Sequence, residues 1–266
     1  MIQYKNRHLT VFQSSLYMTT SAVLCTNDAV IVTDPNWLPL EIEEIKQYVM
    51  NNFGNKQLYI IYTHSDFDHI IGAGAFPGTM AIASEAFYNN PYKDEVLQTI
   101  HQFDQKYYVN RNYKPEYPTA DIVVVQDGQR LELGEITVTF YKAPGHTNDS
   151  LFSVIEPYGI FLAGDYLSDV EFPFITGSYK DYISTIHKAE KILNKHHIKT
   201  LVPGHGTTTD NKQEMIERIK LTKYYLEQLP YDQGEMESLL RKEYKFYEGM
   251  KEIHSENKLK AKEELI

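Results

Sequence analysis

The sequence predicts an α/β protein of the αββα type, in which two β-sheets pack face to face between outer layers of helix, followed by a helical C-terminal tail. One observation is that short β-rich runs fall into two blocks, within residues 9–84 and 130–206. A second is that each block is followed by a segment with helical spacing of its apolar residues. A third is the length, since 266 residues suffice for one large α/β domain with a substantial core.

The first block opens with three β-rich runs separated by turn signals. These runs are residues 9–13, 21–26 and 29–35, with Asp28 in the turn before the third. Their order is typical of an antiparallel meander. Residues 40–50 then place apolar side chains at helical intervals, and residues 56–63 return to an apolar strand. Residues 80–84, MAIAS, predict one more short strand.

Residues 85–120 have no strand period and predict a helical insertion followed by a loop that contains proline. The segment is rich in tyrosine, with residues Tyr88, Tyr92, Tyr107, Tyr108, Tyr113 and Tyr117. Two interpretations stay open for these side chains. They form a wall of a substrate-binding site, or they cover the sheet.

The second block contains two hairpins and a final strand. The first hairpin joins RLELG and EITVTFYKAPGH through a glycine turn, and the second joins SLFSVIEP and GIFLAGD across residues 157–159. Residues 179–196 have a helical period, and IKTLVPGHG predicts the last strand of the core. We therefore expect one domain over residues 1–210.

Residues 211–266 form the predicted tail, which is helical throughout apart from a break near Pro230. Its apolar residues stand among many charges, an amphipathic content that needs a surface to cover. They include Ile216, Ile219, Tyr224, Leu226, Leu239, Leu240, Tyr244, Phe246 and Tyr247. The tail should pack on the domain or on a second subunit, so a homodimer is one expectation.

Composition excludes several classes of function. The net charge of −10 and a pI near 5.5 argue against nucleic acid as a partner. The first ten residues lack the pattern of a secretory signal, and no apolar run approaches the length of a membrane span. We expect a cytoplasmic protein with no membrane partner. Cys25 is the single cysteine, which we interpret as a buried core thiol.

Four potential metal ligands occur within six residues directly after the apolar strand that ends at residue 63. They are His64, Asp66, Asp68 and His69. A short turn at a strand end can direct all of them to one point, and imidazole with carboxylate is a competent ligand set for zinc, iron or manganese. A solvated acidic loop would give the same string, so the segment by itself leaves both interpretations open.

Three more candidates follow strand ends later in the chain. His146 ends the EITVTFYKAPG run, Asp165 ends GIFLAG, and His205 ends KTLVPG. Each stands next to a glycine, which permits tight turns and close approach of the backbone. Because strand ends are where a common site draws its ligands, this order makes coincidence improbable.

Together these segments resemble the metallo-β-lactamase superfamily, whose signature is a His-x-His-x-Asp-His loop, a Gly-His, an Asp after a strand and a final Gly-His. The match spans about residues 10 to 210. The resemblance implies the four-layer αββα fold and a two-metal site. It implies that His64, Asp66 and His146 hold the first metal, that Asp68, His69 and His205 hold the second, and that Asp165 bridges them.

Asp66 departs from that signature, because most relatives have histidine there. Its charge should favour iron or manganese more than an all-imidazole set would, although zinc remains the first expectation for the two divalent metals. The flavodiiron proteins, which reduce oxygen or nitric oxide, have an acidic residue at this position. Since His64, Asp66 and Asp68 alternate, an extended loop would project all three to one side, which makes Asp66 a predicted ligand.

Other residues near the motifs have weaker claims. Asp149 either orients a ligand histidine or closes a turn, and the turn is favoured. Tyr166 follows Asp165 and is the candidate for a phenol that contacts substrate. The remaining histidines match no ligand position and are interpreted as structural or solvated. They are His8, His101, His187, His196, His197 and His254.

The resemblance implies a hydrolase that needs no serine or cysteine nucleophile. Two metals about 3.5 to 4 Å apart can activate a water for attack on a carbonyl or phosphorus centre. Asp68 is the predicted catalytic carboxylate, which orients the nucleophile or carries its proton. The substrate is expected to be a small-molecule ester, lactone, thioester, amide or phosphoester. The alternatives are a diiron redox or gas-binding protein and a non-catalytic binding module.

Overall fold

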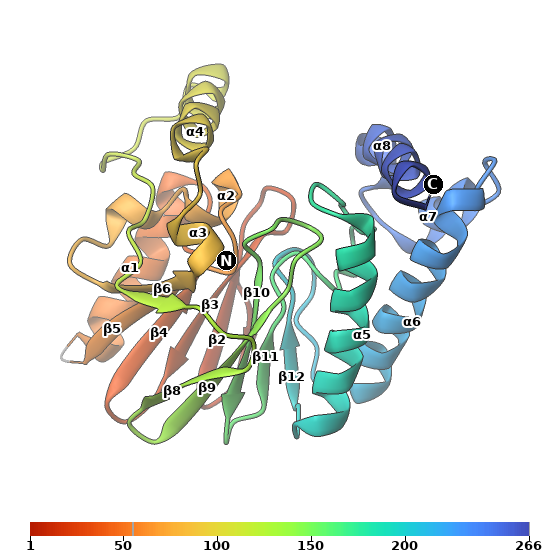
Figure 1. Ribbon diagram of the computed structural model, residues 1–266. Helices are drawn as coiled ribbons and strands as arrows, with labels where there is room; N and C mark the ends of the chain where they lie inside the picture. The colour runs from red at the N-terminus through yellow and green to blue at the C-terminus, as the bar shows by residue number, and fades with distance from the viewer. Residues whose placement is uncertain (55, 266) are drawn as a thin grey trace.

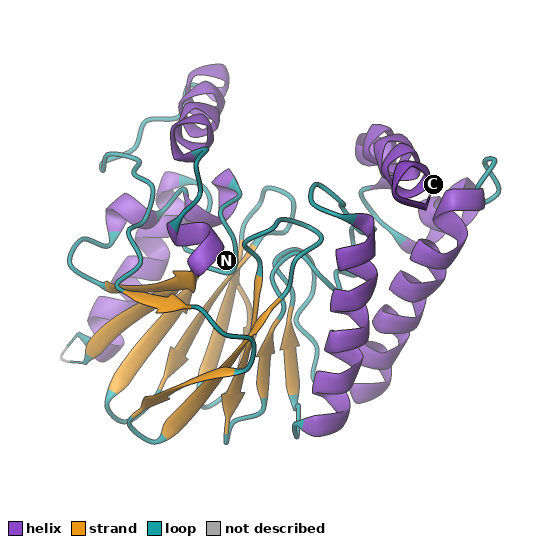
Figure 2. Ribbon diagram, viewed as in Figure 1, coloured by secondary structure: helices purple, strands orange, loops and turns teal. Residues whose placement is uncertain are grey.

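Two mixed β-sheets form the centre of the protein in its computed structural model, which describes residues 1–54 and 56–265 (Figures 1 and 2). The first sheet follows chain order and contains β1 (Ile2–Lys5), β2 (Leu9–Gln13), β3 (Thr20–Cys25), β4 (Ala29–Thr33), β5 (Gln57–Ile61), β6 (Met80–Ser84) and β7 (Ile122–Val124). The second has the order β12 (Thr200–Val202), β11 (Ile160–Leu162), β10 (Leu151–Glu156), β9 (Ile136–Lys142) and β8 (Gln129–Leu133).

Strand direction follows the connections. The meander of β2, β3 and β4 is antiparallel, as predicted, and β4 to β7 are parallel to one another. In the second sheet β8 to β11 are antiparallel neighbours, and β12 pairs with β11 in parallel. The two strands that the sequence did not indicate, β1 and β7, are edge strands of four and three residues.

The space between the sheets is filled by side chains from alternate strand positions. Ala22 and Leu24 of β3 point into this space, whereas Val23 between them packs against the outer helices. Val138 and Phe140 of β9 meet them from the opposite sheet. This period of two gives each sheet two apolar faces, so both outer faces need a covering of helix.

Helices cover both outer faces, which confirms the αββα architecture (Figure 2). On the first sheet lie α1 (Pro39–Phe53), α2 (Phe67–Ile70), the 3₁₀ helix η1 (Ala73–Ala75), α3 (Glu85–Tyr88) and α4 (Lys93–Tyr107). On the side of the second sheet lie α5 (Tyr179–Lys195), α6 (Lys212–Gln228), the 3₁₀ helix η2 (Leu229–Tyr231), α7 (Glu237–Glu243) and α8 (Tyr247–Leu265).

The tail shares one apolar core with α5 and the outer face of the second sheet. That core joins Phe152 and Phe161 of the sheet to Tyr225 of α6 and Met250 of α8. The break near Pro230 is present as η2. One detail was wrong, because Tyr224 is 48% exposed and its neighbour Tyr225 is the buried residue. The division of the chain at residue 210 stays a prediction.

Two features of the first half complete the fold. Cys25 is half-buried at the end of β3, and its Sγ lies 3.2 Å from Nζ of Lys56, so the interpretation as a core thiol was wrong. In the insertion, the Tyr113 and Tyr117 hydroxyls donate to backbone carbonyls beneath them, which fits a covering layer. No helix within residues 1–54 and 56–265 is long and apolar enough to cross a membrane.

Candidate metal centre

The carboxyl ends of several strands meet at one edge of the sandwich. Because β9, β11 and β12 run in the same direction, the residues that follow them emerge together. His146, Asp165 and His205 occupy these positions, and the segment that begins at His64 follows β5 of the facing sheet. The seven predicted ligands thus converge from both sheets into two adjoining His/Asp clusters.

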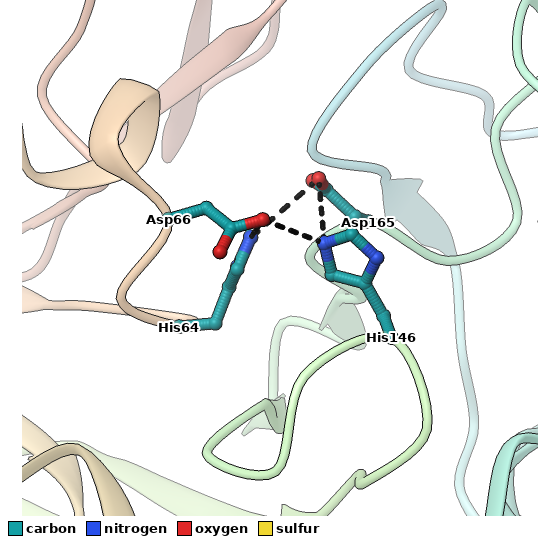
Figure 3. Close-up of side chains that lie close together, drawn as sticks. All are labelled: His64, Asp66, His146 and Asp165. Atoms are coloured by element: carbon teal, nitrogen blue, oxygen red, sulfur yellow. Dashed lines mark hydrogen bonds and ion pairs between the residues drawn. The ribbon is translucent and has the colours of Figure 1, made fainter. Parts of the chain in front are cut away.

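The first cluster consists of His64, Asp66, His146 and Asp165, whose polar atoms point toward one another (Figure 3). Nε2 of His146 lies 3.1 Å from Oδ2 of Asp66 and 3.3 Å from Oδ2 of Asp165. Nε2 of His64 lies 3.6 and 3.5 Å from the same two oxygens. Ligand atoms about 2.1 Å from a shared tetrahedral ion lie about 3.4 Å apart, so these spacings fit one metal ion.

The second cluster consists of Asp68, His69 and His205. Oδ2 of Asp68 lies 3.3 Å from Nε2 of each histidine, and the two Nε2 atoms lie 3.3 Å apart. Asp165 reaches this cluster as well, with Oδ1 3.0 Å from Nε2 of His69 and Oδ2 3.4 Å from Nε2 of His205. Asp165 therefore contacts both clusters, as expected for a bridging carboxylate.

The local conformation of the first motif differs from the extended loop that its alternation suggested. Asp66 is the N-cap of α2, with extended φ and ψ of −60° and 143°, and the helix begins at Phe67. The helical turn directs Asp68 and His69 toward the second cluster, whereas Asp66 stays with His64. Asp66 lies in the first cluster, and its role as a metal ligand stays a prediction. The argument from alternation applies only to His64 and Asp66.

Each histidine has its Nδ1 atom occupied by an acceptor, which leaves Nε2 for a cation. The Nδ1 partners are the Thr63 hydroxyl for His64 at 3.0 Å, Asp34 Oδ2 for His69 at 3.1 Å, the Phe174 carbonyl for His146 at 2.9 Å and the Tyr17 carbonyl for His205 at 3.0 Å. Nε2 of His64 is buried without a hydrogen-bond partner among the described residues. Such outer contacts are typical of metal-bound histidines, so the residues fit a two-metal site.

Carboxylates and imidazoles of the clusters shift each other's pKa values. Partial burial raises the pKa of Asp66, but the hydrogen bond with His146 and the nearby imidazole of His64 outweigh burial and hold that pKa well below its ordinary range. Burial lowers the pKa of His69, but the charges of Asp165 and Asp68 raise it well above 6.5. Because the carboxylates favour the protonated imidazoles, a metal ion that binds these histidines competes with protons.

Asp34 is a functional residue that the sequence reasoning missed. It follows β4, and its carboxylate accepts hydrogen bonds from the Thr63 amide at 2.8 Å, the Thr63 hydroxyl at 2.6 Å and Nδ1 of His69. Its backbone φ of 40° lies in the left-handed region, where non-glycine residues are uncommon. The signal was available, since Asp34 stands between a β-rich run and a proline.

Glycine is required at two positions beside the ligands. A Cβ on Gly204 would lie 2.2 Å from Oδ1 of Asp165 and 3.0 Å from Cε1 of His69. Gly145 has φ of 131°, and a Cβ there would lie 2.4 Å from Cα of Tyr182 in α5. The glycines next to the predicted ligands thus allow neighbouring backbone to approach the metal centre.

The tail contributes a further residue that the sequence did not indicate. Arg218 of α6 is buried, and its Nη1 donates to the carbonyl of Leu167, two residues after Asp165, at 3.1 Å. Its Nη2 lies 3.6 Å from Asp169, whose Oδ1 accepts a hydrogen bond of 2.7 Å from the amide of Thr207. One arginine thereby braces the two loops that carry the ligands Asp165 and His205.

A third missed residue is Glu171, which is buried beside the second cluster. Its Oε1 lies 3.7 Å from Nδ1 of His205. Burial raises the pKa of Glu171 to about 7, and the nearby carboxylates of Asp165 and Asp68 act in the same direction. No sequence pattern indicated Glu171, because only the loop after β11 brings it to His205.

Several weaker expectations are now resolved. Tyr166 is 1% exposed, and its hydroxyl donates to the Ala143 carbonyl and accepts from the His146 amide. It supports the His146 loop from within the core, so the structure does not support a substrate contact. Asp149 accepts from the Thr147 hydroxyl at 2.6 Å and closes a turn. None of the other six histidines joins a metal-ligand cluster within the described residues.

Comparisons with known proteins agree with this geometry. The family model described as the Metallo-beta-lactamase superfamily matches residues 16–205, which include every residue of both clusters. The chain belongs to the metallo-beta-lactamase superfamily. The resemblance seen in the motifs is thereby confirmed at the level of family and fold.

Individual relatives are distant. The Metallo-beta-lactamase type 2 of Bacillus cereus is 24% identical over 210 residues, which cover 75% of this chain and 71% of that protein. The metallo-beta-lactamase from Pontibacter korlensis has a TM-score of 0.60 at 15% identity, covering 84% of this chain and 98% of that chain. The inverting sec-alkylsulfatase Pisa1 from Pseudomonas sp. has a TM-score of 0.66 at 12% identity, covering 90% of this chain and 43% of that chain. The structural similarities establish the fold alone.

Proposed function

We propose that this superfamily member is a two-metal hydrolase of a small-molecule substrate. The observation that supports it most is Asp165, whose carboxylate contacts the Nε2 atoms of histidines in both clusters. A carboxylate placed in this way would be a ligand of both metals, so that both could act on one substrate. A binding module without catalysis would have no need of two complete ligand sets.

The ligand sets would be those of the two clusters. His64, Asp66 and His146 would hold the first metal, Asp68, His69 and His205 the second, and Asp165 both. Two such metals supply a nucleophilic water at neutral pH and a positive charge for the oxygen on which negative charge develops. The chain's own contribution is to fix these ligands through the Nδ1 contacts and to exclude most solvent from them.

Asp68 is the carboxylate that would transfer protons, and Asp66 is the most exposed member of the two clusters. Asp68 would accept the proton of the attacking water and pass it to the leaving group, the role of a general base followed by a general acid. Asp66 has a side chain that is 41% exposed, whereas the other six side chains are at most 10% exposed. Substrate and solvent would therefore reach the first metal on the side of Asp66.

Metal analysis of protein purified without added metal, together with its visible spectrum, tests this proposal. Zinc is the expected metal, and the carboxylate of Asp66 makes manganese or iron the alternatives. Two equivalents of zinc or manganese without a visible band support hydrolysis. Two irons with an oxygen-sensitive band would instead support a diiron redox protein, the second candidate that Asp66 favours.

Activity against a panel completes the test. The panel contains p-nitrophenyl esters, a lactone, a thioester, a phosphodiester and a chromogenic cephalosporin, the last because similar proteins bear the name metallo-beta-lactamase. Hydrolysis of one class that is lost on chelation and restored by metal supports the proposal. A protein that holds two metals and hydrolyses no member of this panel would contradict it.

A further inference from the structure

A groove of about 660 Å³ lies outside the metal centre, within the size range of small-molecule sites. Most of its lining residues come from α4, from the loop between β2 and β3, and from the segment that leads into α8. Figure 1 shows where α4 and α8 lie in the fold. Its lining is mostly apolar. The residues are Ser15, Leu16, Tyr17, Leu38, Phe103, Tyr107, Val109, Lys245, Phe246, Gly249 and Met250.

The groove adjoins the second cluster through Tyr17. The carbonyl of Tyr17 accepts the hydrogen bond from Nδ1 of His205 at 3.0 Å, and its side chain lines the groove. The Tyr17 ring packs 5.6 Å from that of Trp37, which packs 5.3 Å from Phe67. Because Phe67 stands between Asp66 and Asp68 in the chain, this row of aromatic contacts leads from the groove to the motif that supplies both clusters.

The charge of the groove is opposite to that of the whole protein. The chain has a net charge of −10, yet the lining contains no carboxylate and one cation, Lys245. No carboxylate lies within 4.0 Å of the Lys245 ammonium among residues 1–54 and 56–265. Its Nζ lies 3.8 Å from Sδ of Met18, whose carbonyl accepts from the amide of Gly206. The exposed Lys245 ammonium therefore lies on the side of the groove near the loop that carries His205.

We propose that the groove holds the apolar chain or ring of an anionic amphiphile, with the anionic group at Lys245 and the scissile bond at the metals. The substrate class is an alkyl or aryl ester that carries a negative charge near the ester. This inference rests on the proposed function for the reaction, but the binding site stands on its own contacts. The Lys245 ammonium, which has no carboxylate partner among the described residues, is complementary to the anionic group, and the apolar lining is complementary to the chain or ring.

Gly249 provides a variant that blocks the groove. It lines the groove, and a Cβ built on it meets no atom within 4 Å, so a larger side chain enters open space. Gly249→Trp should fill part of the groove, whereas Gly249→Ala should leave it open. Lys245→Glu reverses the charge at the site, and Lys251→Glu makes the same change at an exposed position of α8 outside the lining.

The probe is 8-anilinonaphthalene-1-sulfonate, an aromatic anion whose fluorescence rises in apolar surroundings. We expect one molecule to bind per full-length chain, with affinity at least about tenfold weaker in Lys245→Glu and in Gly249→Trp. Lys251→Glu and Gly249→Ala should bind as the unchanged protein does. Equal affinity of the probe for all four variants would overturn the proposal that the groove binds the anion. Probe binding that appears only on dilution of the protein would also overturn it, because a second copy of the chain would then occupy the groove.

The esterase assay separates this inference from the proposed function. If the probe binds with the expected pattern but no ester is hydrolysed, the proposed function fails and the groove stands. If esters are hydrolysed, Lys245→Glu should raise KM for an anionic ester about tenfold and leave KM for its neutral analogue unchanged. Equal KM changes for both esters would overturn the assignment of the anionic group to Lys245.

Discussion

Oδ2 of Asp34 lies 3.1 Å from Nδ1 of His69, so a carboxylate outside the ligand set holds a ligand histidine in its orientation. The same side chain accepts two hydrogen bonds from Thr63, the residue before His64. One carboxylate therefore fixes a histidine of the second cluster and the start of the motif that supplies the first. Its left-handed backbone conformation is maintained by these contacts.

Asp34→Asn should weaken the second metal about 10- to 100-fold, because the variant removes the charge that supports Nδ1–H of His69. Asparagine tolerates the left-handed conformation, so the fold should persist. Calorimetric titration with Zn²⁺ measures the two affinities, and Asp94→Asn on the exposed face of α4 is the control. Unchanged affinity at both sites would show that Asp34 has no part in holding the metal.

His69→Ala and His205→Ala should each lose one metal equivalent and most of the hydrolytic activity, because each removes a ligand of the second cluster. The loss should exceed the about 10- to 100-fold typical for an outer partner. His197→Ala, outside both clusters, is the matched control. A variant that keeps full activity with a single tightly bound metal would favour a mononuclear mechanism.

Asp66→Ala should empty the first site and spare the second, since Asp66 contacts only His64 and His146 of the clusters. Asp66→His should fold and shift the preference toward zinc, because it removes a negative charge from the first ligand set. Metal content after growth with equal zinc, manganese and iron measures both effects. Two metals at unchanged affinity in Asp66→Ala would remove Asp66 from the ligands.

Gly204→Ala should disturb the bridging carboxylate, because the new Cβ would lie 2.2 Å from Oδ1 of Asp165. We expect a loss of about 1 to 3 kcal/mol in the free energy of unfolding, together with weaker binding of both metals. Denaturant unfolding of the metal-free protein separates the two effects. Gly249→Ala, with open space around its Cβ, should cost nothing.

Asp232→Asn should destabilise the tail by about 2 to 4 kcal/mol, because it leaves Lys258 and His254 without their buried partner. Burial raises the pKa of Asp232, but amide hydrogen bonds from Met236 and Gly234 and the Lys258 ammonium hold it below the ordinary 3.8. A carboxyl group whose pKa is lowered on folding stabilises the folded protein at pH values above its ordinary pKa. This stabilisation is lost as the pH falls below that pKa. The difference between the proteins should be constant near pH 7 and shrink below about pH 4. A constant difference down to pH 2 would contradict this linkage.

Local sequence patterns predicted most of the helices and strands. The meander was readable because alternation and turn residues act within a few positions, and the helices at residues 39–53 and 179–195 because apolar side chains recur every three to four residues. β1 and β7 were missed because short edge strands bury too little to show a pattern. Tyr224 was placed on the wrong face because its neighbour Tyr225 carries the same side chain.

The ligands were readable from the sequence for a related reason. A histidine or aspartate beside a glycine at a strand end can be recognised within each short segment of the sequence. Strands that run in the same direction then bring such ends together. The sequence by itself therefore determined the seven residues of the two clusters and the layered architecture that unites them.

Only the tertiary structure decided which side chains support those ligands. Asp34, Glu171 and Arg218 act on residues 35, 34 and 51 positions away in the chain, at His69, His205 and Leu167. The groove likewise joins residues from α4, the β2–β3 loop and α8. Contacts of this kind depend on how distant elements pack, and no local period or spacing in the sequence encodes them.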